Sequence, residues 1–169
     1  MENFQSIILA IFGFIVLGSY FKYLEDKKSD SYLTNKYWFG LDKNIIIPLI
    51  IFQSFAVIGF LVAIISWIKH PPEGGTFASS SWILFTIVLL FFIFSSIWSY
   101  AVFNNMFYLT IISLIIVAIM SILMLAISVE ETNPRWYITL GLIFLCITTV
   151  LGDGVIWNAN YIVKQKNIL

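Results

Sequence analysis

The chain has 169 residues, of which 60% are hydrophobic and 11% are charged, and its mean hydropathy is +0.96. Soluble domains carry about 25% charged residues, so this composition excludes a soluble globular domain and indicates an integral membrane protein. The formal net charge is zero, so we expect no basic surface for nucleic acid.

Apolar segments long enough to cross a bilayer as helices, which takes about 20 mostly apolar residues, occur five times. They lie at about residues 6–23, 45–68, 81–103, 106–127 and 136–161. We therefore predict an all-α integral membrane protein in which residues 1–169 form a single domain, a five-transmembrane-helix bundle. Little more than Asn104 and Asn105 separates the third and fourth segments, so these helices should be antiparallel neighbours. No lysine or arginine precedes the first segment, which favours a retained span over a signal peptide.

Lysines and arginines predict the orientation of the spans, because they concentrate in cytoplasmic loops. Lys69 and Arg135 fall on one side of the predicted bundle. The other side, which comprises the first loop and the C-terminal tail, holds Lys22, Lys27, Lys28, Lys36, Lys43, Lys164 and Lys166. We therefore expect the N-terminus outside and the first loop and C-terminus in the cytosol. The sequence leaves open a bacterial inner membrane or a mitochondrial outer membrane.

Several residues on the outer side are expected to be ordinary features of a membrane surface. Trp67, Trp82 and Trp136 fall at span ends and should form an interfacial aromatic belt. Glu130 and Glu131 fall in a short outer loop and should face water. His70, which precedes two prolines and has no histidine or cysteine near it, is expected in a solvated loop rather than at a metal site.

Asp153 is the one charged residue between Arg135 and Lys164. An aspartate at the centre of a membrane helix costs about 2.5–3.5 kcal/mol on insertion scales, so it usually faces a cavity or a partner. Trp157 and Asn160 follow at helical spacing and should share its face. Two interpretations remain open: a wall of a ligand pocket, or a carboxylate near enough to the helix end to reach headgroups and water.

Trp98 in the third segment lies at the same predicted depth. Its neighbours Ser95 and Ser99 form a small-xxx-small pair of the kind that packs helices closely, and serine hydroxyls can bond across helices. Tyr32 and Trp38 lie in the first loop on the same side. Tyr32, Trp38, Trp98, Asp153 and Trp157 could thus converge on one site. The alternative is aromatic anchoring at the cytosolic interface.

Two of these segments resemble the translocator proteins, also called tryptophan-rich sensory proteins or TspO. Residues 95–103 read SSIWSYAVF, similar to the family run N-x-x-W-S-x-x-F-F, with Ser95 in place of the asparagine. Residues 153–160 read DGVIWNAN, similar to N-x-x-x-W-x-x-N, with Asp153 in place of the first asparagine. Tyr32 falls at a family tyrosine of the first loop. The loop prolines and the P-Y-x-x-W run early in the last span are missing.

The resemblance implies a five-helix bundle, often a homodimer, that binds protoporphyrin IX or haem, and cholesterol in some members. It implies a pocket between the helices under the first loop. Candidate ligand-binding residues are Tyr32, Trp38, Ser95, Trp98, Asp153 and Trp157.

We therefore predict a membrane receptor for a flat hydrophobic ligand, a tetrapyrrole or a sterol, with no required cofactor. The ligand would stack on Trp98 and Trp157, and Asp153 would hydrogen-bond its polar edge. No acid–base pair, nucleophile or metal-ligand cluster is visible in the sequence, so we do not expect an enzyme. Two alternatives remain: a small transporter or proton-coupled carrier using Asp153, and a structural subunit of a larger membrane assembly.

Overall fold

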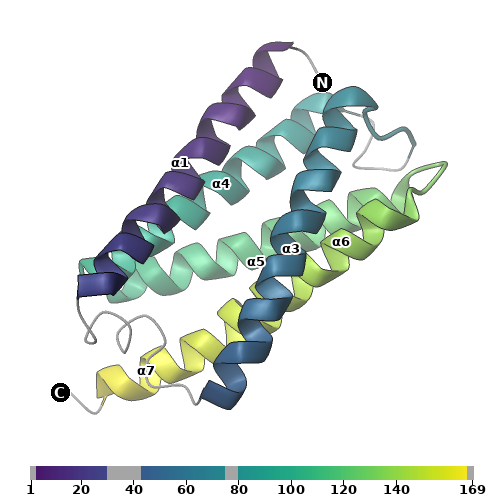
Figure 1. Cartoon of the computed structure of the whole chain (residues 1–169). Coiled ribbons are helices and arrows are strands. Elements are labelled where there is room, and N and C mark those ends of the chain that lie inside the picture. Colours follow the sequence, from purple (N-terminus) through teal and green to yellow (C-terminus); the bar gives the residue numbers. More distant parts are fainter. Residues whose placement is uncertain (1–2, 30–42, 75–79, 167–169) are drawn as a thin grey trace.

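The computed structural model describes residues 3–29, 43–74 and 80–166, and these residues form helices joined by turns, with no strand among them. The elements are α1 (Asn3–Ser29), α3 (Lys43–Lys69), α4 (Ser81–Phe103), α5 (Phe107–Glu130), α6 (Trp136–Cys146), the π-helix η1 (Ile147–Trp157) and α7 (Asn158–Lys166). Figure 1 shows their order along the chain. The predicted site residues Tyr32 and Trp38 lie outside the described residues.

Among the described residues, 4 helical stretches are long and apolar enough to cross a membrane: Ile47–Lys69, Ser81–Val102, Phe107–Glu130 and Trp136–Val163. A shorter apolar helix, Asn3–Ser19, lies within α1. Their lengths and composition confirm an all-α, multi-pass integral membrane protein.

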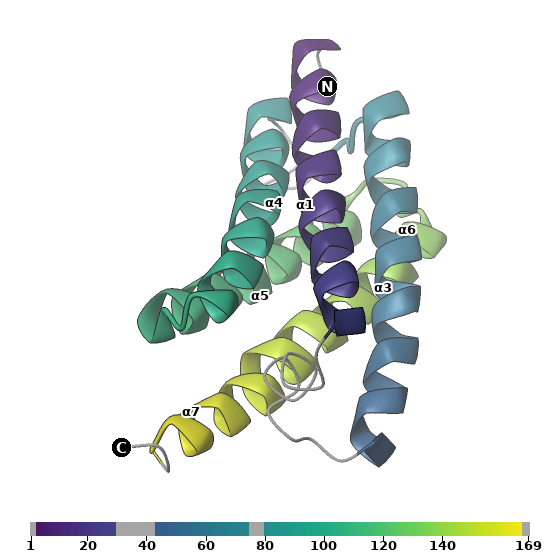
Figure 2. The same ribbon diagram turned by 60° about the vertical axis from the view of Figure 1, so that its left-hand side comes forward.

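The helices pack in two main pairs that α5 joins. α1 and α3 each have one principal partner, α4 and α6 respectively, while α5 packs on α4, α6 and η1. Figures 1 and 2 show α1 running alongside α4, whereas α3 crosses α6. At this crossing the chain places Gly59 against Gly141.

The turn between α4 and α5 is as short as the sequence predicts, and the two helices pack against each other. Asn105 has a positive φ of 57°, a conformation in which asparagine is enriched among non-glycine residues. The backbone N–H of Met106 donates to Ala101 O at 2.9 Å, which closes the turn. The prediction of antiparallel neighbours is confirmed.

Buried side chains form two clusters at different levels of the bundle. The larger cluster joins α1, α3, α4, α5 and α6 and includes Leu9, Phe60, Trp67, Val88 and Ile138. The smaller cluster joins α4, α5 and the end of the last apolar segment, and consists of Trp98, Val102, Leu114, Trp157 and Tyr161. The beginning of this apolar segment contributes Ile138 to the larger cluster, and its end contributes Trp157 and Tyr161 to the smaller one. The segment therefore connects the two clusters.

The last apolar segment is not one uniform α-helix. It changes from α to π at Ile147 and returns to α at Asn158. π-helices are rare, occur mostly as single turns and are frequent at functional sites. This i→i+5 pattern differs from the α-helical spacing on which the expected shared face of Asp153, Trp157 and Asn160 was based. Asp153 and Trp157 have separate surroundings.

Candidate functional site

A cavity of about 410 Å³ lies within the bundle, and Asp153 forms part of its wall. Its lining comes from α1, α3, α4, α5, α6 and η1: Gly13, Val16, Leu17, Gln53, Ala56, Val57, Phe60, Leu61, Phe91, Phe92, Ser95, Trp98, Val117, Leu145, Thr148, Thr149 and Asp153. Most of these side chains are apolar. Three of the predicted site residues, Ser95, Trp98 and Asp153, therefore line a single cavity.

The polar side chains of the wall differ in what they offer to a ligand. The hydroxyl of Thr149 donates to the carbonyl of Leu145 at 2.9 Å, and that of Thr148 donates to the carbonyl of Phe144. These donors are thus engaged within their own helix. Asp153 is half-buried, and none of the described basic side chains forms an ion pair with it. Its carboxyl group is the acidic acceptor in the cavity wall.

Trp157 lies behind Trp98 rather than in the cavity wall. The two ring centroids are 5.7 Å apart in an edge-to-face arrangement, with an angle of 68° between the planes. Trp157 also stacks on Tyr161 at 5.1 Å, and Tyr161 stacks on Phe107 at 5.3 Å. The structure thus brings the two predicted tryptophans together, with Trp98 in the cavity wall and Trp157 packed against it.

The serines around Trp98 bond mainly within α4. The Ser96 hydroxyl donates to Phe92 O at 3.0 Å, and the Ser99 hydroxyl donates to Ser96 O at 3.0 Å. The hydroxyl pair that does join two helices was not anticipated. It consists of Ser121 on α5 and Thr149 on η1, whose oxygens are 2.6 Å apart.

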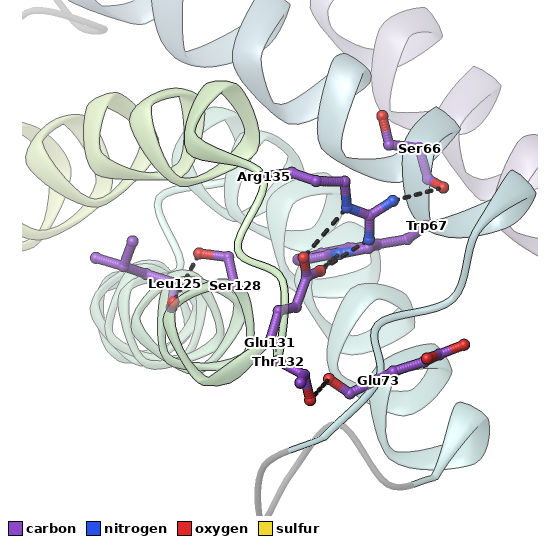
Figure 3. Close-up of polar contacts among 8 residues, drawn as sticks. All are labelled: Ser66, Trp67, Glu73, Leu125, Ser128, Glu131, Thr132 and Arg135. Carbon is purple, nitrogen blue, oxygen red and sulfur yellow. Dashed lines mark hydrogen bonds and ion pairs between the residues drawn. The ribbon is translucent and has the colours of Figure 1, made fainter.

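A second polar cluster, formed by Trp67, Glu131 and Arg135, lies where α3 meets the turn between α5 and α6 (Figure 3). Trp67 Nε1 donates to Glu131 Oε1 at 2.8 Å. Arg135 donates to both carboxylate oxygens, from Nη2 to Oε1 at 2.8 Å and from Nε to Oε2 at 3.1 Å. The hydrogen bond to Glu131 raises the pKa of Arg135 above its ordinary value, so the guanidinium stays charged.

This second cluster overturns two expectations. Glu131 is buried rather than facing water, and Trp67 is fully buried rather than part of an interfacial belt. Trp82 and Trp136, in contrast, are exposed, at 51% and 73%. A neighbouring bond from Thr132 N to Glu73 O, at 2.9 Å, ties the turn to the segment after α3. Glu131 and Arg135 lie in the non-helical turn between α5 and α6, so helical spacing gave no signal for this pair. No local signal pointed to Trp67.

Gln53 is a cavity residue that the sequence analysis missed, although an amide in the middle of an apolar segment was a visible signal.

No group of three or more potential metal ligands occurs among the residues described by the structure. Comparisons of the chain with protein-family models, with characterised proteins and with solved structures found no match.

Proposed function

We propose that the cavity between the helices is the binding site of a membrane receptor for a flat hydrophobic ligand, either a tetrapyrrole or a sterol. The observation that carries this proposal is a mostly apolar cavity between the helices with an indole and an acid in its wall. Ligand sites are typically about 300–1,000 Å³, mostly apolar, and fixed by a few placed polar groups. The volume of about 410 Å³ falls within this range.

Each part of the wall has a role in such binding. Phe60, Phe91 and Phe92 supply apolar contact area from α3 and α4. The indole of Trp98 offers an aromatic surface, and aromatic pairs add about 0.5–1.5 kcal/mol beyond the area that they bury. Asp153 accepts a hydrogen bond from the pyrrole N–H of a tetrapyrrole or the hydroxyl of a sterol. Trp157 holds Trp98 in place.

The resemblance of residues 95–103 and 153–160 to the translocator proteins supports the same assignment.

We further propose that α1 is a fifth crossing, with the N-terminus outside and the first loop and C-terminus cytosolic. Reporter fusions at the two termini test this topology. A cytosolic reporter that is active at both ends would contradict it, because five crossings place the ends on opposite sides.

The ligand proposal is tested by titrating the purified protein in detergent with protoporphyrin IX and, separately, with a fluorescent sterol. Tryptophan quenching reports binding in both titrations. We expect saturable quenching by at least one ligand and weaker affinity in Trp98→Leu. Trp82→Leu is the matched control, because Trp82 is an exposed tryptophan that does not line the cavity. Equal affinities for the two variants, or no saturable binding of either ligand, would refute this site.

A further inference from the structure

The cavity wall is incomplete on the side of α1 and α3. Leu17, Val57 and Leu61 line the cavity and yet are 44%, 51% and 47% exposed at the surface. In contrast, the lining residues of α5 and α6, Val117 and Leu145, are buried. Among the lining residues, the exposed ones are thus these three side chains, and all of them lie on α1 and α3.

The helix packing explains why this side is open. α1 packs on α4 and α3 packs on α6, so the two helices barely touch each other. Figure 2 shows both ribbons facing the viewer. Gly13, which lines the cavity on α1, narrows the opening least because it has no side chain. A Cβ at this position would meet only the ring of Phe92, at 3.6 Å.

The opening lies at the level of the hydrocarbon core. Gly13 and Leu17 fall within the apolar stretch Asn3–Ser19, and Val57 and Leu61 fall near the middle of the span Ile47–Lys69. At this depth the surrounding medium is lipid acyl chain rather than water. An apolar cavity that opens here is in contact with acyl chains.

We propose that the cavity opens sideways into the bilayer between α1 and α3, and that a phospholipid acyl chain occupies it when no other ligand is bound. The opening and its acyl chain stand on the geometry alone. One consequence rests on the proposed function: the ligand is loaded from the lipid phase, so its class is restricted to molecules that partition into membranes and displace an acyl chain.

The test uses bromine on phospholipid acyl chains as a contact quencher of tryptophan. The full chain is reconstituted into vesicles of phosphatidylcholine, either unmodified or brominated on its acyl chains. The emission lost on Trp98→Phe substitution defines the Trp98 component. Trp98 is only 4% exposed, so quenching of this component requires an acyl chain inside the cavity. We expect brominated vesicles to quench most of it.

Two glycines of α1 provide a matched pair of blocking and control variants. Gly13→Phe places a ring in the opening, whereas Gly18→Phe places one where a Cβ has no atom within 4 Å. The bromine quenching of the Trp98 component should be lost in Gly13→Phe and retained in Gly18→Phe. If Gly13→Phe does not fold, Val57→Phe replaces it, with Ile58→Phe as control, because Ile58 is exposed but does not line the cavity.

An unquenched Trp98 component in the wild-type chain, or equal quenching in the blocking and control variants, would overturn the lateral opening. Protoporphyrin IX and sterol titrations of the same samples keep the two proposals separate. Bromine quenching without binding of either ligand would refute the proposed function and leave the opening in place. Binding of either ligand without bromine quenching would refute the lateral opening and leave the proposed function in place.

Discussion

Gly59 and Gly141 bring the backbones of α3 and α6 into direct contact. A Cβ added to Gly59 would lie 2.3 Å from Gly141 Cα, and one added to Gly141 would lie 2.5 Å from Gly59 Cα. Small residues at such crossings let membrane helices approach closely, because association there depends on packing rather than on the hydrophobic effect. This contact fixes how α3 lies against the last apolar segment, and thereby positions one wall of the cavity.

We expect Gly59→Ala and Gly141→Ala each to destabilise the protein by about 1–3 kcal/mol, the usual cost of overpacking. The added methyl group meets backbone atoms, which cannot rotate away. Gly18→Ala is the control, since a Cβ there has no atom within 4 Å, and alanine favours helix over glycine by about 1 kcal/mol. Unfolding in mixed detergent micelles measures the difference. A Gly59→Ala protein as stable as Gly18→Ala would contradict the close crossing.

The hydroxyl pair of Ser121 and Thr149 joins α5 to η1 inside the membrane. Interhelical hydrogen bonds of this kind contribute about 0.6 kcal/mol on average, and about 1.7 kcal/mol at most, in double-mutant cycles. We expect a coupling energy in this range from Ser121→Ala, Thr149→Val and the double variant. A cycle between Ser121→Ala and Thr110→Val, whose hydroxyl bonds Met106 O in its own helix, should give no coupling. Additive effects in both cycles would show that the bridge contributes nothing.

Glu131 is the centre of the second polar cluster, so its removal should be costly. Glu131→Ala leaves the buried Trp67 N–H without its acceptor and Arg135 without its carboxylate. An unsatisfied buried polar group costs about 1–3 kcal/mol, and we expect a loss of this size in the free energy of unfolding. Glu73→Ala should change it by less than about 0.5 kcal/mol, as is usual for exposed side chains. Equal stability of the two variants would count against a structural role of the cluster.

The cluster should also be insensitive to alkaline pH. The folded-state pKa of Arg135 is raised by its hydrogen bond to Glu131. A raised pKa contributes stability that is fully present below the unfolded-state pKa and is lost only as pH rises through the folded-state value. For a guanidinium both values lie far above neutral pH. A loss of stability between neutral and mildly alkaline pH that disappears in Arg135→Met would contradict this assignment.

Two substitutions of Asp153 distinguish a hydrogen-bonding wall from a proton carrier. If Asp153 accepts a hydrogen bond from the ligand, Asp153→Asn should keep most of the ligand affinity, because the amide oxygen of asparagine still accepts. Asp153→Leu should lose about 1 kcal/mol, the net value of one hydrogen bond. Titration with the better of the two ligands measures both. Equal loss in both variants, together with proton flux in liposomes that stops in Asp153→Asn, would favour the carrier.

The sequence predicted the features that depend on composition along one segment. Span length and hydropathy located four membrane helices, and the spacing of Asn104 and Asn105 predicted the tight turn between α4 and α5. The lone acid in the last apolar segment pointed to Asp153, which does line a cavity. The helices and the turn could be predicted because each depends on local properties of the chain.

The features that the sequence analysis missed depend on contacts between distant segments. Trp67 looked like an interfacial tryptophan because its buried acceptor, Glu131, is 64 residues away. The packing of Trp157 against Trp98 joins two helices that are far apart in the sequence. No pattern within one helix shows that Gly59 meets Gly141, or that α1 and α3 leave a gap.

The π-helical segment η1 determines where the last span tolerates the insertion or deletion of a residue. The i→i+5 pattern of η1 accommodates a chain length that an uninterrupted α-helix would not fit. Each α-helical residue advances the chain by about 100° around the axis. A deletion of one residue between Ile147 and Trp157 can be absorbed by a return of η1 to α-helix. Deleting one residue between Asn158 and Asn160, in α7, would instead turn everything beyond it by roughly that angle. Tyr161 would then leave the ring of Phe107 that it stacks on. Beyond η1, this span should therefore accept substitutions on its lipid face far more readily than the insertion or deletion of a single residue.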